Sequence, residues 1–281
     1  MRHSNNIGTV LNLRKGIPHL LHQIQTLDLE FLDFFLPVAE ETVSPSELQQ
    51  LHTQVEIPVT YHYTTSTILA SPQTYSFIKE QIFYYIDQAD RYGVPVFVIH
   101  PPSTRRKIAK TNIKFKDEEW FHHHLDNTVT TAYNESVAYL TQLLYDIESE
   151  KKNRNVIIAI ENTDHNPQDF DQRIETMATL KEIIEPFHSS KIGMCYDSYK
   201  AFTNQEELSL TDYGMYISHI QLSDFSVSKN KGHLGLTKGD LPLADIIAQC
   251  RDIQYSGHFS LEVSKEEFNE SKEFVQEELE V

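Results

Sequence analysis

The chain has 281 residues, of which 40% are hydrophobic and 23% are charged, and its formal net charge at pH 7 is -17. A negative charge of this size opposes binding to a nucleic-acid polyanion, so nucleic acid is disfavoured as a partner and a small molecule is favoured. Two cysteines are too few for a disulfide framework, and no apolar run approaches the roughly 18 residues of a membrane span.

The first half of the chain predicts strands alternating with helices. The N-terminal sequence MRHSNNIGTV lacks the apolar core of a signal peptide, so we expect a cytoplasmic protein with no membrane partner. Short apolar runs predict strands, and apolar residues at helical spacing predict helices between them. The strands are 6–13, 29–36, 57–63 and 94–100, and the helices are 16–27, 44–54, 71–93 and 127–150.

A polar insertion, residues 101–126, precedes the last of these helices. Its basic residues Arg105, Arg106 and Lys107 are interpreted as a solvated loop, with phosphate binding as the alternative. The histidine run 122–124 is interpreted as an exposed cluster rather than a metal site.

The second half continues the alternation and places a carboxylate near the end of three strands. The predicted strands are 155–162, 191–197, 215–224 and 258–263, and the predicted helices are 171–187, 241–253 and 264–279. The last helix begins with the capping-box pattern SKEE. Glu161, Asp197 and Glu262 each lie at or near the end of a buried-looking run, which suggests that these strands converge on one site.

Strands alternating with helices imply a parallel sheet, either doubly wound or closed as a barrel. The chain contains neither GxGxxG nor GxxxxGK[ST], which removes the usual nucleotide-binding forms of the open sheet. We therefore predict an α/β fold with one domain over residues 1–281, a (β/α)8 TIM barrel whose site lies at the carboxyl ends of the strands. Side-chain alternation then predicts that Ala159, Cys195 and Ser260 point inward beneath the three carboxylates.

Further polar residues lie near the predicted strand ends, and they are His62, His100, His219 and Gln221. Several carboxylates in a low dielectric repel one another unless a cation lies between them. Oxygen ligands suit Mg²⁺ or Mn²⁺, and imidazole widens the choice toward Zn²⁺. His219 is interpreted as a hydrogen-bonded residue of the barrel interior, with metal ligation as the alternative.

The motifs IENT, CYDSYKAF, HIQLSD followed by HLGLTKGDLPL, and SLEV resemble, in order and spacing, those of the xylose isomerase-like barrels. That group contains sugar and sugar-phosphate isomerases and epimerases, and also endonuclease IV. The resemblance is most specific over residues 156–263. It implies that Glu161, Asp197 and Glu262 are metal ligands and that Gln221, as in hydroxypyruvate isomerases, stands where a histidine ligand is usual.

Two lysines depart from the family pattern. Lys200 replaces a histidine that binds substrate or a second metal, and Lys231 replaces an aspartate found in endonuclease IV. A protonated lysine cannot ligate a metal, so a three-zinc site is disfavoured and we expect one divalent ion, Mn²⁺, Mg²⁺ or Zn²⁺. The alternative left open is that Lys200 pairs with the carboxylates and no metal binds.

The resemblance implies a metal-dependent isomerase or epimerase of a small sugar, sugar phosphate or hydroxy-keto acid. Glu161 and Glu262 would transfer the proton through an enediolate. The residues expected to hold the small carbohydrate substrate are His62, His100, Lys200 and His233. The alternatives are an endonuclease IV-like phosphodiesterase and a metal-free, non-catalytic sugar-binding barrel; oligomerisation is left open.

Overall fold

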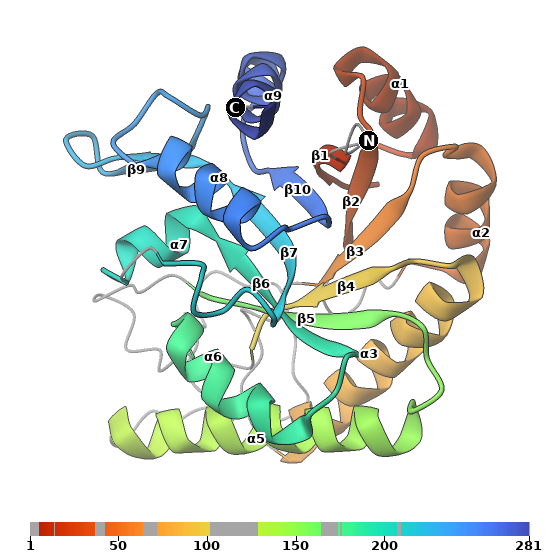
Figure 1. Cartoon of the computed structure of the whole chain (residues 1–281). Helices are drawn as coiled ribbons and strands as arrows, with labels where there is room; N and C mark the ends of the chain where they lie inside the picture. The colour runs from red at the N-terminus through yellow and green to blue at the C-terminus, as the bar shows by residue number, and fades with distance from the viewer. Residues whose placement is uncertain are drawn as a thin grey trace.

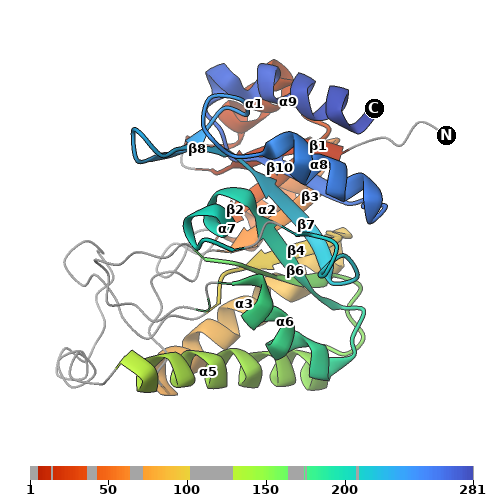
Figure 2. The ribbon, with the colours of Figure 1, turned by 60° about the vertical axis from the view of Figure 1, so that its left-hand side comes forward.

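The chain folds as a closed barrel of parallel strands surrounded by helices in a computed structural model (Figures 1 and 2). The structure describes residues 6–13, 15–36, 43–63, 72–101, 129–163, 174, 176–206 and 209–280. Within these ranges, eight strands close in the order β1-β10-β7-β6-β5-β4-β3-β2, and a two-stranded antiparallel hairpin, β8-β9, lies outside the barrel. The predicted α/β barrel is therefore confirmed.

The barrel strands correspond to the apolar runs of the sequence because each is buried by helices on its outer face. They are β1 (Asn6–Leu11), β2 (Phe31–Leu36), β3 (Val59–Tyr63), β4 (Val96–Ile99), β5 (Ile157–Glu161), β6 (Ile192–Asp197), β7 (Ile217–Leu222) and β10 (His258–Leu261). The prediction of one strand over 215–224 is wrong at its end. The chain leaves the barrel after Leu222, and Asp224 begins the hairpin strand β8 (Asp224–Ser226), which pairs with β9 (Lys231–Leu234).

The helices follow the predicted spacing with small shifts at their ends. They are α1 (Ile17–Leu27), α2 (Pro45–Gln54), α3 (Pro72–Tyr92), α5 (Val129–Glu150), α6 (Met177–Ile184) with the 3-10 turn η2 (Glu185–Phe187), α7 (Ser198–Thr203), α8 (Leu243–Asp252) and α9 (Lys265–Glu280). Ser44 caps α2 through a capping box with Glu47. Helix α6 begins at Met177, later than predicted, because Thr176 caps it there. The short helix α7 was not predicted.

Strand register aligns the inward-facing residues into rows across the barrel. One row joins Glu161 to Cys195 and Cys195 to His219, and the next joins Asp197 to Gln221 and Gln221 to Ser260. Cys195 also belongs to a small apolar cluster that is separate from the main core, and its other members are Val96, Val98 and Ala159. The predicted inward direction of Ala159 and Cys195 is consistent with their place in this buried apolar cluster inside the barrel.

Contacts between α9 and the start of the chain help to close the barrel. Lys272 Nζ donates to the Asp28 carbonyl oxygen at 2.7 Å and lies 3.3 Å from Glu30 Oε1. Glu30 Oε2 in turn accepts a hydrogen bond from the Ile7 backbone N–H at 3.0 Å. Figure 1 shows α9 beside α1, where this linkage joins the two ends of the described chain. Among the described helices, none combines the length and the apolar character that crossing a membrane requires.

Candidate functional site

Glu161, at the end of β5, is the centre of a buried polar cluster at the carboxyl ends of the strands. Its Oε1 atom pairs with Lys200 Nζ. Its Oε2 atom lies 2.8 Å from His100 Nε2 and 3.2 Å from His62 Nε2. Because Glu161 is fully buried, these partners replace the water that an exposed carboxylate would have.

Lys200 reaches this cluster because Asp197 begins a helix there. Asp197 Oδ1 accepts a hydrogen bond from the Lys200 backbone N–H at 3.0 Å and so caps α7, which follows β6 directly (Figure 1). The other oxygen, Oδ2, lies 3.1 Å from Lys200 Nζ. One carboxylate therefore starts the helix and also pairs with the ammonium that the first turn of the helix carries.

Asn162 fixes the neighbouring strand ends relative to each other. Its Oδ1 accepts from the Asp197 backbone N–H at 2.7 Å, and its Nδ2 donates to the Asp197 carbonyl oxygen at 3.1 Å. The sequence analysis did not single out Asn162. Its place directly after Glu161, in a buried strand end, is the signal that could have identified it.

Asp33, on β2, lies within the barrel and was also missed. Its Oδ2 lies 3.2 Å from His219 Nε2 and 3.8 Å from His62 Nδ1, and its Oδ1 accepts from Thr60 Oγ1 at 3.0 Å. His219 therefore contacts a carboxylate of the barrel interior, as its interpretation as a hydrogen-bonded barrel residue predicts. A lone charge inside the apolar run FLDFFL is the signal for Asp33, because a charge within a buried strand needs partners.

Glu262 follows β10 and meets the hairpin. His233 Nδ1, on β9, lies 3.4 Å from Glu262 Oε2, and the His233 side chain is half exposed. Asp224 holds the base of this hairpin: its carboxylate accepts from the backbone N–H groups of Phe225, Gly239 and Leu241. The Asp224 carboxylate is thus committed to the loop, whereas Glu262 stays beside the polar cluster.

The charges of the cluster are distributed unevenly. Burial raises the pKa of Glu161, but the contacts with His100 and Lys200 outweigh burial and hold it well below its usual range. Burial lowers the pKa of His62, yet the hydrogen bond to Glu161 and the field of Asp33 raise it to about 9. Burial raises the pKa of Glu262, against the opposing field of Lys200. The two glutamates are therefore pushed toward opposite protonation states.

The pKa values of Lys200 and His100 are shifted in opposite directions. Burial lowers the pKa of Lys200, but Asp197 and Glu161 raise it well above its usual value. Burial lowers the pKa of His100 despite the pull of Glu161. The cluster therefore carries its positive charge on Lys200 and His62.

The four predicted metal ligands do not form an open set for a divalent ion. Lys200 Nζ pairs with both Glu161 and Asp197, which leaves these carboxylates already compensated. Gln221 is fully buried, and its side-chain amide lies 3.2 Å from His62 Nδ1. The predicted quartet Glu161, Asp197, Gln221 and Glu262 thus fits a metal poorly while Lys200 stays in place.

A different set has the spacing of a metal site. Ligand atoms of His62, His100 and Glu161 lie within 4.8 Å of one another. Their separations are 3.2 Å between the two Nε2 atoms, 3.2 Å from His62 to Glu161 Oε2 and 2.8 Å from His100 to the same oxygen. Ligands about 2.0–2.1 Å from a four-coordinate zinc lie about 3.3 Å apart, so this triad fits such an ion.

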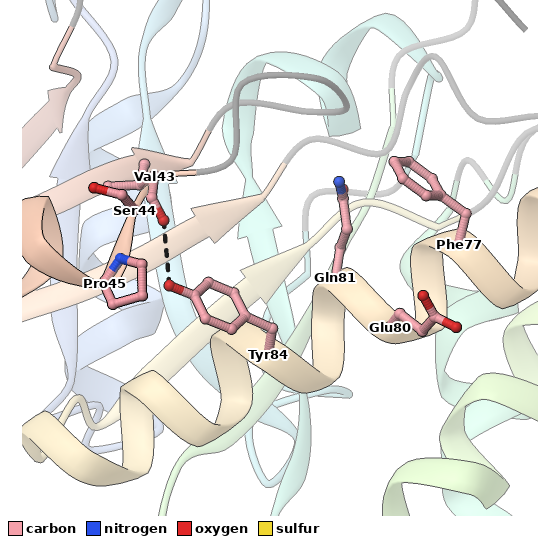
Figure 3. Close-up of a pocket in the computed structure, with 7 residues that line it drawn as sticks. All are labelled: Val43, Ser44, Pro45, Phe77, Glu80, Gln81 and Tyr84. Atoms are coloured by element: carbon pink, nitrogen blue, oxygen red, sulfur yellow. Dashed lines mark hydrogen bonds between the residues drawn. The ribbon is translucent and has the colours of Figure 1, made fainter.

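A cavity of about 380 Å³ lies away from this cluster, between the start of α2 and the face of α3 (Figure 3). It is lined by Val43, Ser44, Pro45, Phe77, Glu80, Gln81 and Tyr84, none of which belongs to the predicted site. Tyr84 Oη donates across it to the Val43 carbonyl oxygen at 3.2 Å. The titratable groups that could carry chemistry therefore lie at the strand ends and not in this cavity.

The basic residues 105–107 and the histidines 122–124, which the sequence analysis interpreted as exposed, lie outside the described residues.

A family model described as xylose isomerase-like TIM barrel matches residues 23–281. The chain is similar to the structure of a D-tagatose 3-epimerase-like protein, with a TM-score of 0.73 and 19% identity over 98% of this chain and 97% of that one. It is also similar to a D-allulose 3-epimerase from Methylomonas sp., with a TM-score of 0.72 and 11% identity over 98% of each chain.

A third similar structure is that of a Thermus thermophilus protein soaked with ZnCl2, with a TM-score of 0.66 and 18% identity over 97% of each chain. The comparison with curated proteins found no matching sequence. At these identities the similar structures establish the fold alone.

Proposed function

We propose that this chain, which belongs to the xylose isomerase-like TIM barrel family, is a sugar isomerase or epimerase that moves a proton beside the carbonyl of a small substrate. One observation carries the proposal: a single ammonium, Lys200, pairs with two carboxylates from the ends of different strands, Glu161 and Asp197. Catalytic residues of barrel enzymes come from the ends of different strands, as these do.

Glu161 and Glu262 are the proposed proton-transfer groups. The pKa of Glu262 is raised by burial, and that of Glu161 is held low by His100 and Lys200 although burial alone would raise it. An acid and a base working as a pair need environments that separate their pKa values in this way. Glu262, whose pKa burial raises, can supply a proton, and Glu161, whose pKa is held low, can accept one at the carbon beside the carbonyl.

The remaining residues suit binding rather than proton transfer. Lys200 offers a positive charge for an oxygen that becomes anionic, and His233, half exposed on the hairpin, can donate to a hydroxyl. His62 and His100 would hold one divalent metal ion together with Glu161, the proposed proton acceptor. When bound, such an ion supplies Lewis acidity that stabilises negative charge on substrate oxygens.

The names of the similar structures guide the choice of substrates. Those proteins are described as D-tagatose 3-epimerase-like, D-allulose 3-epimerase and L-ribulose 3-epimerase. We propose a small ketose or hydroxy-keto acid as the substrate here, because the cluster combines a cation for a carbonyl oxygen with two carboxylates for an α-proton.

The test is proton exchange followed by NMR in D₂O. Purified protein is incubated with D-tagatose, D-allulose, L-ribulose and a hydroxy-keto acid, with and without added Zn²⁺ or Mn²⁺. We expect deuterium to enter the carbon beside the carbonyl and an isomer or epimer to form. Glu262→Gln and Glu161→Gln should each lower the rate by about 10²–10⁴-fold, the usual contribution of a positioned general acid or base. The matched control is Glu266→Gln, an exposed glutamate of α9.

Equal turnover in Glu161→Gln, Glu262→Gln and the unmodified protein would overturn the proposal. Binding of a sugar without isotope exchange would instead favour the non-catalytic barrel. An abasic-site DNA duplex is incubated in parallel, and its cleavage, lost on chelation, would favour the phosphodiesterase. We do not expect this cleavage, because Lys200 compensates two of the carboxylates that a metal cluster would need.

A further inference from the structure

The polar cluster consists of two halves that share Glu161. The carboxylate half contains Glu161 Oε1, Asp197 and Glu262, and Gln221 lies beside Asp197 in the strand register. The imidazole half contains His62, His100 and Glu161 Oε2. Lys200 lies in the first half and contacts none of the ligand atoms of the second by an ion pair or hydrogen bond among the described residues.

Lys200 is built into the carboxylate half and is not a surface side chain that happens to reach it. The residue is 7% exposed, and its backbone is fixed by the cap that Asp197 forms on α7. Burying an ammonium is costly unless anions surround it, and here it has Glu161 and Asp197. Removing Lys200 would take the ammonium away from Asp197 and would leave Glu161 with the imidazoles of His62 and His100 alone.

We propose that Lys200 is a resident cation that takes the place of a divalent ion in the carboxylate half, so that a metal is admitted only to the imidazole half. A hard cation such as Mg²⁺ requires oxygen ligands, and the carboxylate oxygens that could serve are those that Lys200 compensates. The imidazole half suits Zn²⁺ and does not depend on Lys200 for its ligands. This assignment concerns ion binding and stands whether or not the chain turns over a sugar.

The experiment compares Lys200→Ala with Lys200→Arg, which keeps a cation. Each protein is dialysed against a chelator and then titrated with Mg²⁺, Mn²⁺ and Zn²⁺. The melting temperature is measured at each step. Bound metal is counted by elemental analysis, and bound Mn²⁺ is also counted by electron paramagnetic resonance. We expect Mg²⁺ to raise the melting temperature of Lys200→Ala but not of the unmodified protein or Lys200→Arg. With Mn²⁺, Lys200→Ala should hold about one ion more per chain than the unmodified protein.

Two further variants decide between the halves. His100→Ala should abolish Zn²⁺ binding in the unmodified protein and leave the gained Mg²⁺ response in the Lys200→Ala background. Asp197→Asn should abolish that gained response. If Lys200→Ala does not fold, Lys200→Gln, which keeps more of the side-chain volume, replaces it.

The proposal is overturned by either of two results. The first is a folded Lys200→Ala or Lys200→Gln protein that gains no divalent ion. The second is measured on proteins that keep Lys200. If Mg²⁺ or Mn²⁺ binding survives His100→Ala but is lost in Asp197→Asn, an ion binds in the carboxylate half despite Lys200. Because every readout is ion binding, failure here is distinct from failure of the proposed sugar chemistry.

Discussion

His62 Nε2 lies 3.2 Å from Glu161 Oε2, so the third barrel strand supplies a charged partner to the carboxylate at the end of the fifth. On its other side, His62 Nδ1 lies 3.8 Å from Asp33 Oδ2. A buried imidazole between two carboxylates is stabilised in its protonated form, and the pKa of His62 rises to about 9 although burial by itself would lower it.

This shift predicts a loss of stability in alkaline solution. The folded pKa of about 9 lies above the unfolded value of about 6.5, so the contribution of His62 is complete below pH 6.5 and is lost as the pH rises through 9. The free energy of unfolding should fall by up to about 3 kcal/mol over this window. Urea denaturation at pH 6, 7.5 and 9, with a chelator present, measures it. His62→Gln should flatten the dependence, whereas the exposed His22→Gln should not.

Asp33→Asn should destabilise the protein strongly. Asp33 is fully buried and faces His62 and His219, and burial raises its pKa while His219 and His62 lower it to about 2. Removing one partner of a buried ion pair leaves the other charge uncompensated, so we expect a loss of about 3–5 kcal/mol. Denaturation at pH 6 measures it. The pKa of His62, followed by NMR, should also fall; a variant with unchanged stability and an unchanged His62 pKa would contradict this reading.

Sequence periodicity located the strands because each barrel strand is an apolar run bounded by polar residues. It also placed Glu161, Asp197 and Glu262 at or near strand ends, since the parallel strands of a barrel deliver their final residues to one rim. The same reasoning failed for the hairpin. HIQLSD looks continuous, but the backbone N–H groups of Phe225, Gly239 and Leu241 bind Asp224 and turn the chain out of the barrel.

The contacts of Lys200 could not be derived from spacing. They depend on a helix of six residues, too short to show periodicity, whose first turn is set by the Asp197 cap. The triad His62, His100 and Glu161 was likewise hidden, because its members lie far apart in the chain and only the pairing of β3, β4 and β5 brings both imidazoles to the same oxygen of Glu161, Oε2. The sequence identified these residues as candidates for the site, but their contacts with one another follow from the three-dimensional packing of the strands and of α7.

Metal binding at the triad should depend steeply on pH. A bound ion needs neutral imidazole, and His62 is protonated below about pH 9, so the ion must displace that proton. The affinity for Zn²⁺ should therefore rise by up to about tenfold per pH unit between pH 6 and 8. Isothermal titration in buffers of different ionisation enthalpy measures both the affinity and the proton release. Affinity that does not change with pH, or that persists in His100→Ala, would place the ion elsewhere.

Glu206 gives a pH effect outside the site. It follows α7, its Oε1 accepts from the Met177 backbone N–H at 2.6 Å at the start of α6, and burial raises its pKa to about 7 despite that hydrogen bond. The unfolded pKa is near 4.5, so the contribution of Glu206 is complete below pH 4.5 and is lost as the pH rises from there through 7. Glu206→Gln keeps an acceptor for Met177 but cannot ionise, so at pH 8 it should be more stable than the unmodified protein by about 1 kcal/mol, after allowance for solvent screening. At pH 4, below the unfolded pKa, the two proteins should have nearly equal stability. Denaturation at both pH values measures the difference, and a variant that is less stable at pH 8 would show that the ionised carboxylate is the better partner for α6.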